Sequence, residues 1–116
     1  MSDHSPVTTK EIPTESWEDW CVTFTNGNRG RLISSIELVG HEIGDEPLAE
    51  GVPLVAIDYD PVHKGNDVVI SYGQEAAPTR HLIQAPVRLR QAQDAKGLVV
   101  SLEIENQNGR RTILSF

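Results

Sequence analysis

The chain has 116 residues, of which 38% are hydrophobic, 23% are charged and 5% are aromatic. This length suits a single domain, because domains commonly contain about 100–150 residues. The composition excludes collagen, a disulfide scaffold and a wholly disordered chain. It also excludes a membrane-spanning helix, because a span needs about 20 consecutive apolar residues and the apolar runs here are far shorter.

Charge is unevenly distributed along the chain, whose formal net charge is −7. Fourteen of the 17 acidic residues lie in residues 1–75, and six of the ten basic residues follow residue 75. The negative total repels phosphate backbones, so nucleic acid is not an expected partner. The C-terminal basic residues are expected to be solvated side chains on strands, with a local basic face as the alternative: Arg80, Arg88, Arg90, Lys96, Arg110 and Arg111.

Cysteine content and chain termini indicate a reducing compartment. Cys21 is the sole cysteine, so an internal disulfide is impossible. Residues 1–5 lack the positive and apolar regions of a signal peptide, and residues 113–116 form no prenylation motif. We therefore expect a bacterial cytoplasmic protein without a membrane anchor.

The N-terminal region is predicted to contain a flexible tail and one helix. Residues 1–11 are polar and unpatterned, as expected of a tail. The spacing i, i+3, i+4 and i+7 then places four side chains on one side of a helix: Trp17, Trp20, Cys21 and Phe24. Asn26 and Gly27 predict the end of the helix. A strand over residues 20–25 is the alternative, because this segment contains β-branched residues.

Beyond Gly30 the hydrophobic period changes to two, which predicts strands. Residues 40–53 are rich in acids, glycine and proline and predict a loop. Strict alternation predicts that Val87 and Leu89 point inward, as do the members of a second alternating run: Leu98, Val100, Leu102 and Ile104. The expected strands cover residues 32–39, 54–59, 67–73, 80–84, 87–92, 98–105 and 110–116.

These elements predict one α+β domain over residues 12–116. An N-terminal amphipathic helix would precede a six- or seven-stranded antiparallel meander, forming a curved sheet or a partly open barrel. Half-polar strands indicate that one sheet face meets water and the other meets the core. The aromatic side of the helix would cover that apolar face.

Turn and core patterns carry a resemblance to a family of short bacterial proteins of unknown function. The likeness covers about residues 12–116 and includes Ile12-Pro13 followed by Trp17, and a strand after Arg29-Gly30. Its other features are Pro53-Leu54-Val55-Ala56-Ile57, Asp60-Pro61, the Gly65-Asn66-Asp67 turn, and the hairpin joining residues 102–105 to residues 112–116. The resemblance implies a fold and no catalytic role, because the shared features are structural.

The turn from Asp58 to Asp67 is a candidate cation site. Asp58, Asp60 and His63 lie close in sequence, and carboxylates with an imidazole can hold a divalent cation. However, Pro61 interrupts the calcium-loop pattern and no glutamate follows at its twelfth position. An acidic turn is therefore the favoured interpretation. The four histidines lack helical metal-binding spacing: His4, His41, His63 and His81.

Other catalytic patterns are weak. Cys21 lies on the apolar side of the predicted helix, where a thiol is usually inert packing, and no serine lies in a nucleophile elbow. Glu103 and Glu105 are expected to form cross-strand ion pairs with four arginines: Arg88, Arg90, Arg110 and Arg111. The sequence thus predicts no catalytic residue, no cofactor and no metal ligand.

The sequence favours a non-catalytic protein-interaction or regulatory module, with a protein partner or self-association. The strand ending at Phe116 is the predicted edge for association. Trp17 and Trp20 could cover the core or anchor a partner, and the core is favoured. One alternative is a nucleic-acid-binding oligomer that uses the basic C-terminal strands, because the helix-then-sheet plan is similar to that of Sm-like rings. A second alternative is a metal-binding protein or enzyme at the turn formed by Asp58, Asp60 and His63.

Overall fold

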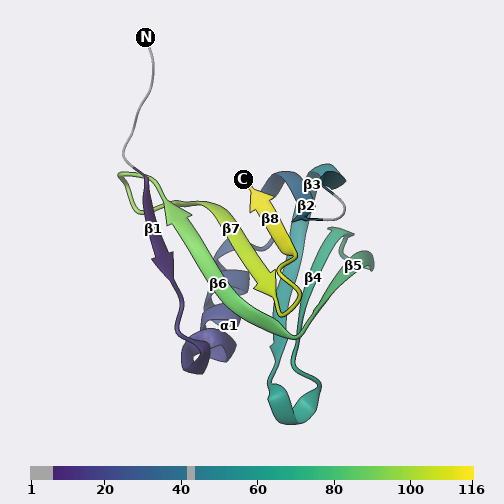
Figure 1. Cartoon of the computed structure of the whole chain (residues 1–116). Coiled ribbons are helices and arrows are strands. Elements are labelled where there is room, and N and C mark those ends of the chain that lie inside the picture. Colours follow the sequence, from purple (N-terminus) through teal and green to yellow (C-terminus); the bar gives the residue numbers. More distant parts are fainter. Residues whose placement is uncertain (1–6, 42–43) are drawn as a thin grey trace.

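One long helix and an antiparallel sheet make up the computed structural model of the chain, which describes residues 7–41 and 44–116 (Figure 1). The helical segments are the 3₁₀ turn η1 (Thr14–Ser16), helix α1 (Trp17–Asn28) and the 3₁₀ turn η2 (Val62–Lys64). The strands are β1 (Thr8–Glu11), β2 (Leu32–Gly40), β3 (Gly44–Asp60), β4 (Asp67–Gln74), β5 (Ala77–Gln84), β6 (Pro86–Gln93), β7 (Val99–Asn106) and β8 (Arg111–Ser115).

The sheet has eight strands in the order β1-β6-β7-β8-β2-β3-β4-β5. Every pair is antiparallel, and β1 and β5 form the two edges, so the sheet is curved but not closed into a barrel. This confirms the α+β class and the curved meander. The prediction of six or seven strands was low by one or two; the strand absent from the seven expected ranges is β1, whose sequence has weak strand propensity.

Strand β3 includes residues 44–53, which the sequence assigned to a loop over residues 40–53; residues 42–43 of that range lie outside the described part of the chain. It runs for 17 residues, pairs with β2 through Pro53 and pairs with β4 from Leu54 onward. Gly51 lies near this change of partner with φ +63°, a conformation that glycine adopts without a Cβ penalty. Acidic residues, glycine and proline disfavour strands locally, but pairing with β2 outweighs that preference.

Residues 8–11, which the sequence assigns to the tail, form β1. Thr8 to Glu11 pair with residues 90–93 of β6, and the Ile12 amide continues the contact by donating to the Leu89 carbonyl oxygen at 2.8 Å. The earlier residues of the predicted tail, 1–6, lie outside the described part of the chain. Pairing to a neighbouring strand supplies order that the local sequence does not encode.

Helix α1 forms as the aromatic spacing predicts, and the alternative strand over residues 20–25 is wrong. Trp17, Cys21 and Phe24 are buried, and Trp20 is half-buried. The helix continues to Asn28, past the predicted stop at Gly27, and the Asn28 side-chain amide donates to the Phe24 carbonyl oxygen at 2.9 Å. Gly30, with φ +86°, then turns the chain toward β2.

The core lies between α1 and the curved sheet, with α1 behind β6 and β7 in the view of Figure 1. The Trp17 indole N–H donates to the Ile12 carbonyl oxygen at 2.8 Å, and the Trp20 indole N–H donates to Gln91 Oε1 at 3.0 Å. Thr25 joins α1 to β3, because its Oγ1 accepts from the Ile57 amide at 3.0 Å and donates to the Ile57 carbonyl oxygen at 3.1 Å. These two hydrogen bonds pair the backbone N–H and C=O of Ile57, in the half of β3 that no longer pairs with β2.

Two predicted inward side chains are exposed. Val87 is 51% exposed because it lies at a register shift of β6, between Pro86 and Arg88. Leu98 is 50% exposed because it precedes the start of β7 at Val99. The alternation predicts the core correctly at Leu89, Leu102 and Ile104, all of which are buried.

The predicted association edge is also wrong. Strand β8, which ends just before Phe116, lies between β7 and β2 and is bonded on both sides. Phe116 packs against Phe24 with ring centroids 5.8 Å apart and lies beneath the Arg31 guanidinium at 4.4 Å. The last strand in sequence is internal because it pairs with β2 on the side away from β7. Within the described residues, no helix is long and apolar enough to cross a membrane.

Candidate functional site

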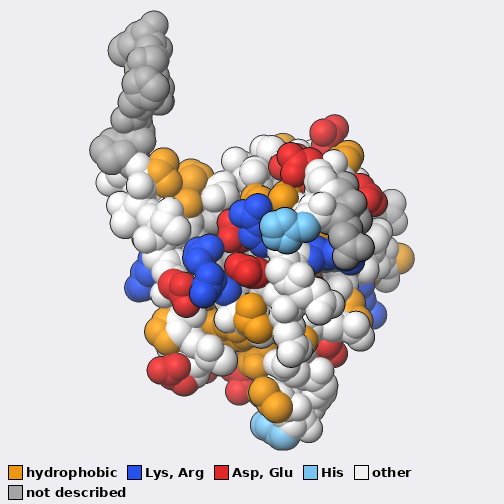
Figure 2. Space-filling view, viewed as in Figure 1, with side chains coloured by type: hydrophobic (Ala, Val, Ile, Leu, Met, Phe, Trp, Pro, Cys, Tyr) orange, Lys and Arg blue, Asp and Glu red, His pale blue; other side chains and the backbone are white. Residues whose placement is uncertain are grey.

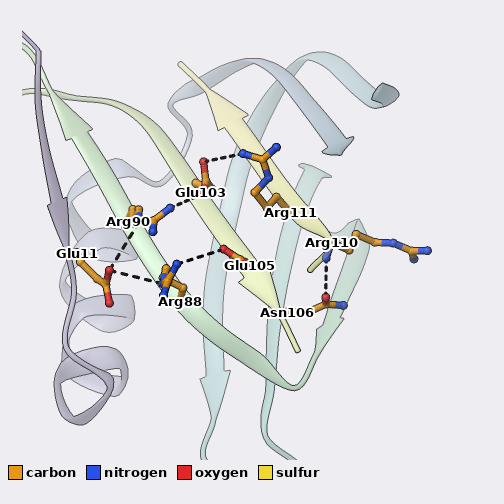
Figure 3. Close-up of polar contacts among 8 residues, drawn as sticks. All are labelled: Glu11, Arg88, Arg90, Glu103, Glu105, Asn106, Arg110 and Arg111. Carbon is orange, nitrogen blue, oxygen red and sulfur yellow. Dashed lines mark hydrogen bonds and ion pairs between the residues drawn. The ribbon is translucent and has the colours of Figure 1, made fainter. Parts of the chain in front are cut away.

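A band of alternating charge crosses the solvent face of β1, β6, β7 and β8 (Figures 2 and 3). Arg90 Nη1 lies 2.9 Å from Glu103 Oε2, and Arg88 Nη1 lies 3.8 Å from Glu105 Oε1. Arg111 Nη1 lies 3.9 Å from Glu103 Oε1. These contacts confirm the predicted cross-strand ion pairs for three of the four arginines.

Glu11 extends this band, which we call the charge ladder. Its Oε1 lies 3.7 Å from Nε of both Arg88 and Arg90, as Figure 3 shows. The sequence did not indicate this contact because residue 11 was assigned to the tail. Arg110 does not join the ladder: its backbone amide donates to Asn106 Oδ1 at 2.9 Å, and its side chain points away in Figure 3.

The ladder places carboxylates beside three of the six residues of the basic face, which the sequence analysis gave as the alternative to solvated strand side chains. Exposed ion pairs contribute about 0–1 kcal/mol each, so their contribution to stability is small. Their effect on the surface potential matters more, because each paired arginine has a carboxylate beside it. A hollow of about 500 Å³ beside the ladder is lined by ladder residues together with His41 and Asp45.

The turn that the sequence gave as a candidate cation site does not bring its side chains together. Asp58 and Asp60 lie on one face of β3, Asp60 is opposite Asp67 of β4, and His63 lies exposed in η2. Among the residues that the structure describes, no group of three His, Cys, Asp or Glu side chains is placed to hold a metal ion. The proximity of Asp58, Asp60 and His63 in sequence therefore does not become a cluster in space.

A larger hollow lies between α1 and the outer face of β3, β4 and β5. We call it the α1–β3 groove; its volume is about 690 Å³. Apolar side chains contribute much of its lining: Val22, Val55, Ala56, Ile57, Val69, Ala76 and Pro78. Its charged lining residues are Glu18 on α1, Asp58 and Asp60 on β3, Glu75 in the turn before β5, and Arg80 on β5.

Cys21 lies on the α1 side of this groove and is 2% exposed. Burial, and then the negative charge of Asp58, raise the pKa of the Cys21 thiol to about 12. The thiol is therefore protonated near neutral pH, which opposes nucleophilic chemistry because the thiolate is the reactive form. Burial, and then the charges of Glu18 and Cys21, also raise the pKa of Tyr59 at the groove.

His81 lines a third hollow, of about 440 Å³, between β5 and the turn joining β7 to β8. Its Nε2 lies 3.3 Å from the Thr112 hydroxyl oxygen. Burial, and then the charge of Arg110, lower the pKa of the His81 imidazole, which favours the neutral ring. His41 and His63 are exposed, and His4 lies outside the described residues.

The groove was not predicted from the sequence, because its walls come from segments separated by up to about 60 residues. The sequence signal that could have indicated it was weak. Val22 is an apolar residue off the aromatic side of α1, and Val69 and Leu82 lie opposite each other on β4 and β5. Only the packing of α1 against β3 brings these apolar positions to one surface.

Comparison with known proteins gives a family without an assigned function. The family model described as "Family of unknown function (DUF5335)" matches residues 8–116. An uncharacterised protein of Aquifex aeolicus (strain VF5) is 31% identical over 108 residues, which cover 93% of this chain and 91% of that protein. No solved structure matches the chain. The match of the family model from β1 to the end of the chain shows that this protein belongs to the family of unknown function DUF5335.

Proposed function

We propose that this protein is a non-catalytic binding module that recognises a segment of a partner protein in the α1–β3 groove. The observation that carries the proposal is the groove itself, an open hollow of about 690 Å³ lined by both apolar and charged side chains. Protein interfaces commonly combine apolar and polar surface in comparable shares.

Exposed apolar side chains extend the groove on two sides. Val22 on α1 is 61% exposed, and Leu82 on β5 is 50% exposed. Leu82 is the register partner of Val69, which lines the groove floor, so the apolar surface continues from β4 to β5. A partner segment that covered these side chains would remove them from water, and that transfer contributes about 25 cal/mol per Å² of apolar surface.

The chemical groups at the groove support binding rather than catalysis. The Cys21 thiol is 2% exposed, and its pKa is raised to about 12. A nucleophile needs an adjacent base and an accessible reactive atom. The Cys21 thiol lacks an accessible reactive atom, because it is buried and protonated.

The charge ladder supports a protein partner over nucleic acid. Arg88, Arg90 and Arg111 each lie within 4 Å of a carboxylate, so a phosphate backbone would have to displace those contacts. Displacement exposes carboxylates to phosphates of the same sign.

Selection from a random displayed-peptide library, with the folded protein as bait, tests this function. The expected result is an enriched peptide set whose binding falls for the double variant Val22→Gln/Val69→Gln. The double variant Val62→Gln/Val87→Gln makes the same chemical change at exposed valines outside the groove and is expected to bind normally. Absence of enrichment, or equal loss of binding in both variants, would overturn the proposal.

A further inference from the structure

We propose that the α1–β3 groove selects an extended peptide segment that carries lysine or arginine at alternate positions. This inference rests on the proposed function and adds the chemistry of the partner. The occupant is a segment of another protein. The acidic lining of the groove favours a cationic segment, and the spacing of two of its carboxylates matches that of alternate side chains in an extended chain.

Charge complementarity is the first observation. Four carboxylates and one guanidinium line the groove, from Glu18, Asp58, Asp60, Glu75 and Arg80. The carboxylates come from α1, β3 and the turn before β5, and Asp58 is the register partner of Val69, which also lines the groove. A cationic side chain can therefore form an ion pair in the groove while its aliphatic stem contacts the apolar lining.

The spacing of Asp58 and Asp60 is the second observation. They are two residues apart on β3, and strand geometry places such residues about 6.6 Å apart on one face. A second extended chain lying along β3 repeats its own side chains at the same interval. Lysine or arginine at alternate positions would thus meet both carboxylates, and the intervening residues would face the other way.

Short side chains line the groove beside the carboxylates. Ala56, Ala76 and Pro78 line it together with Val55 and Val69. The aliphatic stems of lysine or arginine can lie along such side chains while their charged groups reach the carboxylates.

The charge ladder competes weakly for a cationic segment. On the charge ladder each carboxylate already lies within 4 Å of an arginine, so added cations gain little there. The whole chain carries −7, which attracts a cationic partner over long range and raises its rate of association. The same field opposes nucleic acid, and it also opposes a second copy of this chain.

The test compares three fluorescein-labelled peptides of eight residues by fluorescence anisotropy with the whole protein. The first peptide alternates lysine with alanine and valine, and the other two replace every lysine with glutamine or with glutamate. The lysine peptide is expected to bind at least about tenfold more tightly than the glutamine peptide, because two partly exposed ion pairs together supply about that factor. Raising the salt concentration should weaken this binding, since salt screens exposed charges.

Two charge-matched variants locate the contact. Asp58→Asn/Asp60→Asn is expected to weaken binding of the lysine peptide about tenfold. Glu46→Gln/Glu50→Gln removes the same charge from exposed positions on the first half of β3, outside the groove, and is expected to change binding less than about twofold. Amide chemical-shift changes on adding the peptide should centre on Val22, Ala56 and Val69.

The outcomes separate this inference from the proposed function. If the glutamine peptide binds as tightly as the lysine peptide, the inference is wrong and the groove still binds protein. Equal weakening by the two double variants, tighter binding of the glutamate peptide, or absence of binding by all three peptides also overturns the inference. Tighter binding of a labelled oligouridylate would assign the groove to nucleic acid and overturn it too. The library selection decides the proposed function independently of these results.

Discussion

The two tryptophans show how hydrogen bonding decides the role of a residue. Trp17 is 2% exposed and packs edge-on against Tyr59, with ring centroids 5.2 Å apart. Trp20 is half-buried and stacks on Phe24 at 4.9 Å. Both indole N–H groups have protein acceptors, at Ile12 and Gln91. Buried indoles need such acceptors, so both tryptophans belong to the core, as the sequence favoured.

Cys21 is expected to be unreactive in the folded protein. With a pKa of about 12, only about one thiol in 10,000 is ionised near pH 8, whereas an unfolded cysteine is ionised in substantial proportion. A maleimide reagent should therefore label the native protein at least about a thousandfold more slowly than the urea-unfolded chain. Mass spectrometry over time measures both rates.

The variant Asp58→Asn is the control for the cause of this inertness. Burial is the larger cause and the Asp58 charge the smaller one, so the variant should remain nearly as unreactive as the native protein. Rapid labelling of native Cys21 would contradict the structure, and rapid labelling only in the variant would reverse the order of the two causes.

His81 is expected to make the fold sensitive to mild acid. Its folded pKa lies below the unfolded value of 6.5, so the unfolded state takes up a proton first as the pH falls. The His81 contribution is therefore constant above about pH 6.5 and declines below it until the folded state is also protonated. The denaturant midpoint, measured between about pH 7.5 and pH 5, should fall less in His81→Gln than in the native protein.

The matched substitution His63→Gln identifies the group responsible. His63 lies exposed in η2, away from Thr112 and Arg110. An equal reduction of the pH dependence in both variants would show that the effect does not come from the contact between His81 and Thr112.

At the scale of single elements, α1 was predictable because its signal is local. Four residues at helical spacing place an apolar stripe on one side, and three of them are buried. The hydrogen bonding of α1 to the backbone of β3 was not predictable. Thr25 looks like an ordinary β-branched residue near the end of a helix, and its role arises only because the unpaired side of β3 lies against it.

Thr25→Val tests this bridge between helix and strand. The substitution keeps the shape of the side chain and leaves the Ile57 N–H and C=O without their hydroxyl partner. The free energy of unfolding should fall by about 1–3 kcal/mol, the cost of leaving buried polar groups unpaired. Thr23→Val on the exposed side of α1 is the control and should change stability by less than about 0.5 kcal/mol. Equal effects of the two substitutions would show that the bridge adds nothing.

In the strands of the charge ladder, too, the sequence predicted the local pattern but not which residues meet. Alternation correctly placed arginines and glutamates outside, because a strand has a side-chain period of two. The register then decided which charges meet, with Arg90 opposite Glu103 and Arg88 opposite Glu105. The contact of Glu11 could not be foreseen, because four polar residues form β1 only by pairing with β6.

At the scale of the whole molecule, β3 bends the sheet. Its first half belongs with β2 and its second half with β4, and Gly51 adopts φ +63° just before the partner changes. The first half of β3 was not predicted, because its composition is typical of loops and strand pairing depends on segments that are distant in sequence. The second half of β3, together with β4, β5 and α1, contributes the side chains that line the α1–β3 groove.

Gly51→Ala is expected to destabilise the fold by about 1–2 kcal/mol, the cost of a left-handed conformation for a residue with a Cβ. No heavy atom lies within 4 Å of the added Cβ, so the cost comes from backbone conformation rather than a clash. Gly27→Ala is the matched control, because Gly27 is helical and equally unobstructed. That substitution should stabilise the protein by up to about 1 kcal/mol. Thermal unfolding measures both, and a shift of the same sign in the two variants would contradict the assigned conformations.

The sequence by itself determined the helix, most of the strands, the core alternation and the excess of acids in residues 1–75, because helical spacing, period-two alternation and charge are local properties of the chain. Tertiary structure alone decided that residues 8–11 and 44–53 are strands, that β8 is internal, and that carboxylates from α1 and β3 border one groove. Those features depend on which distant segments pair, and the free energy of pairing outweighs the weak local preferences of the residues involved.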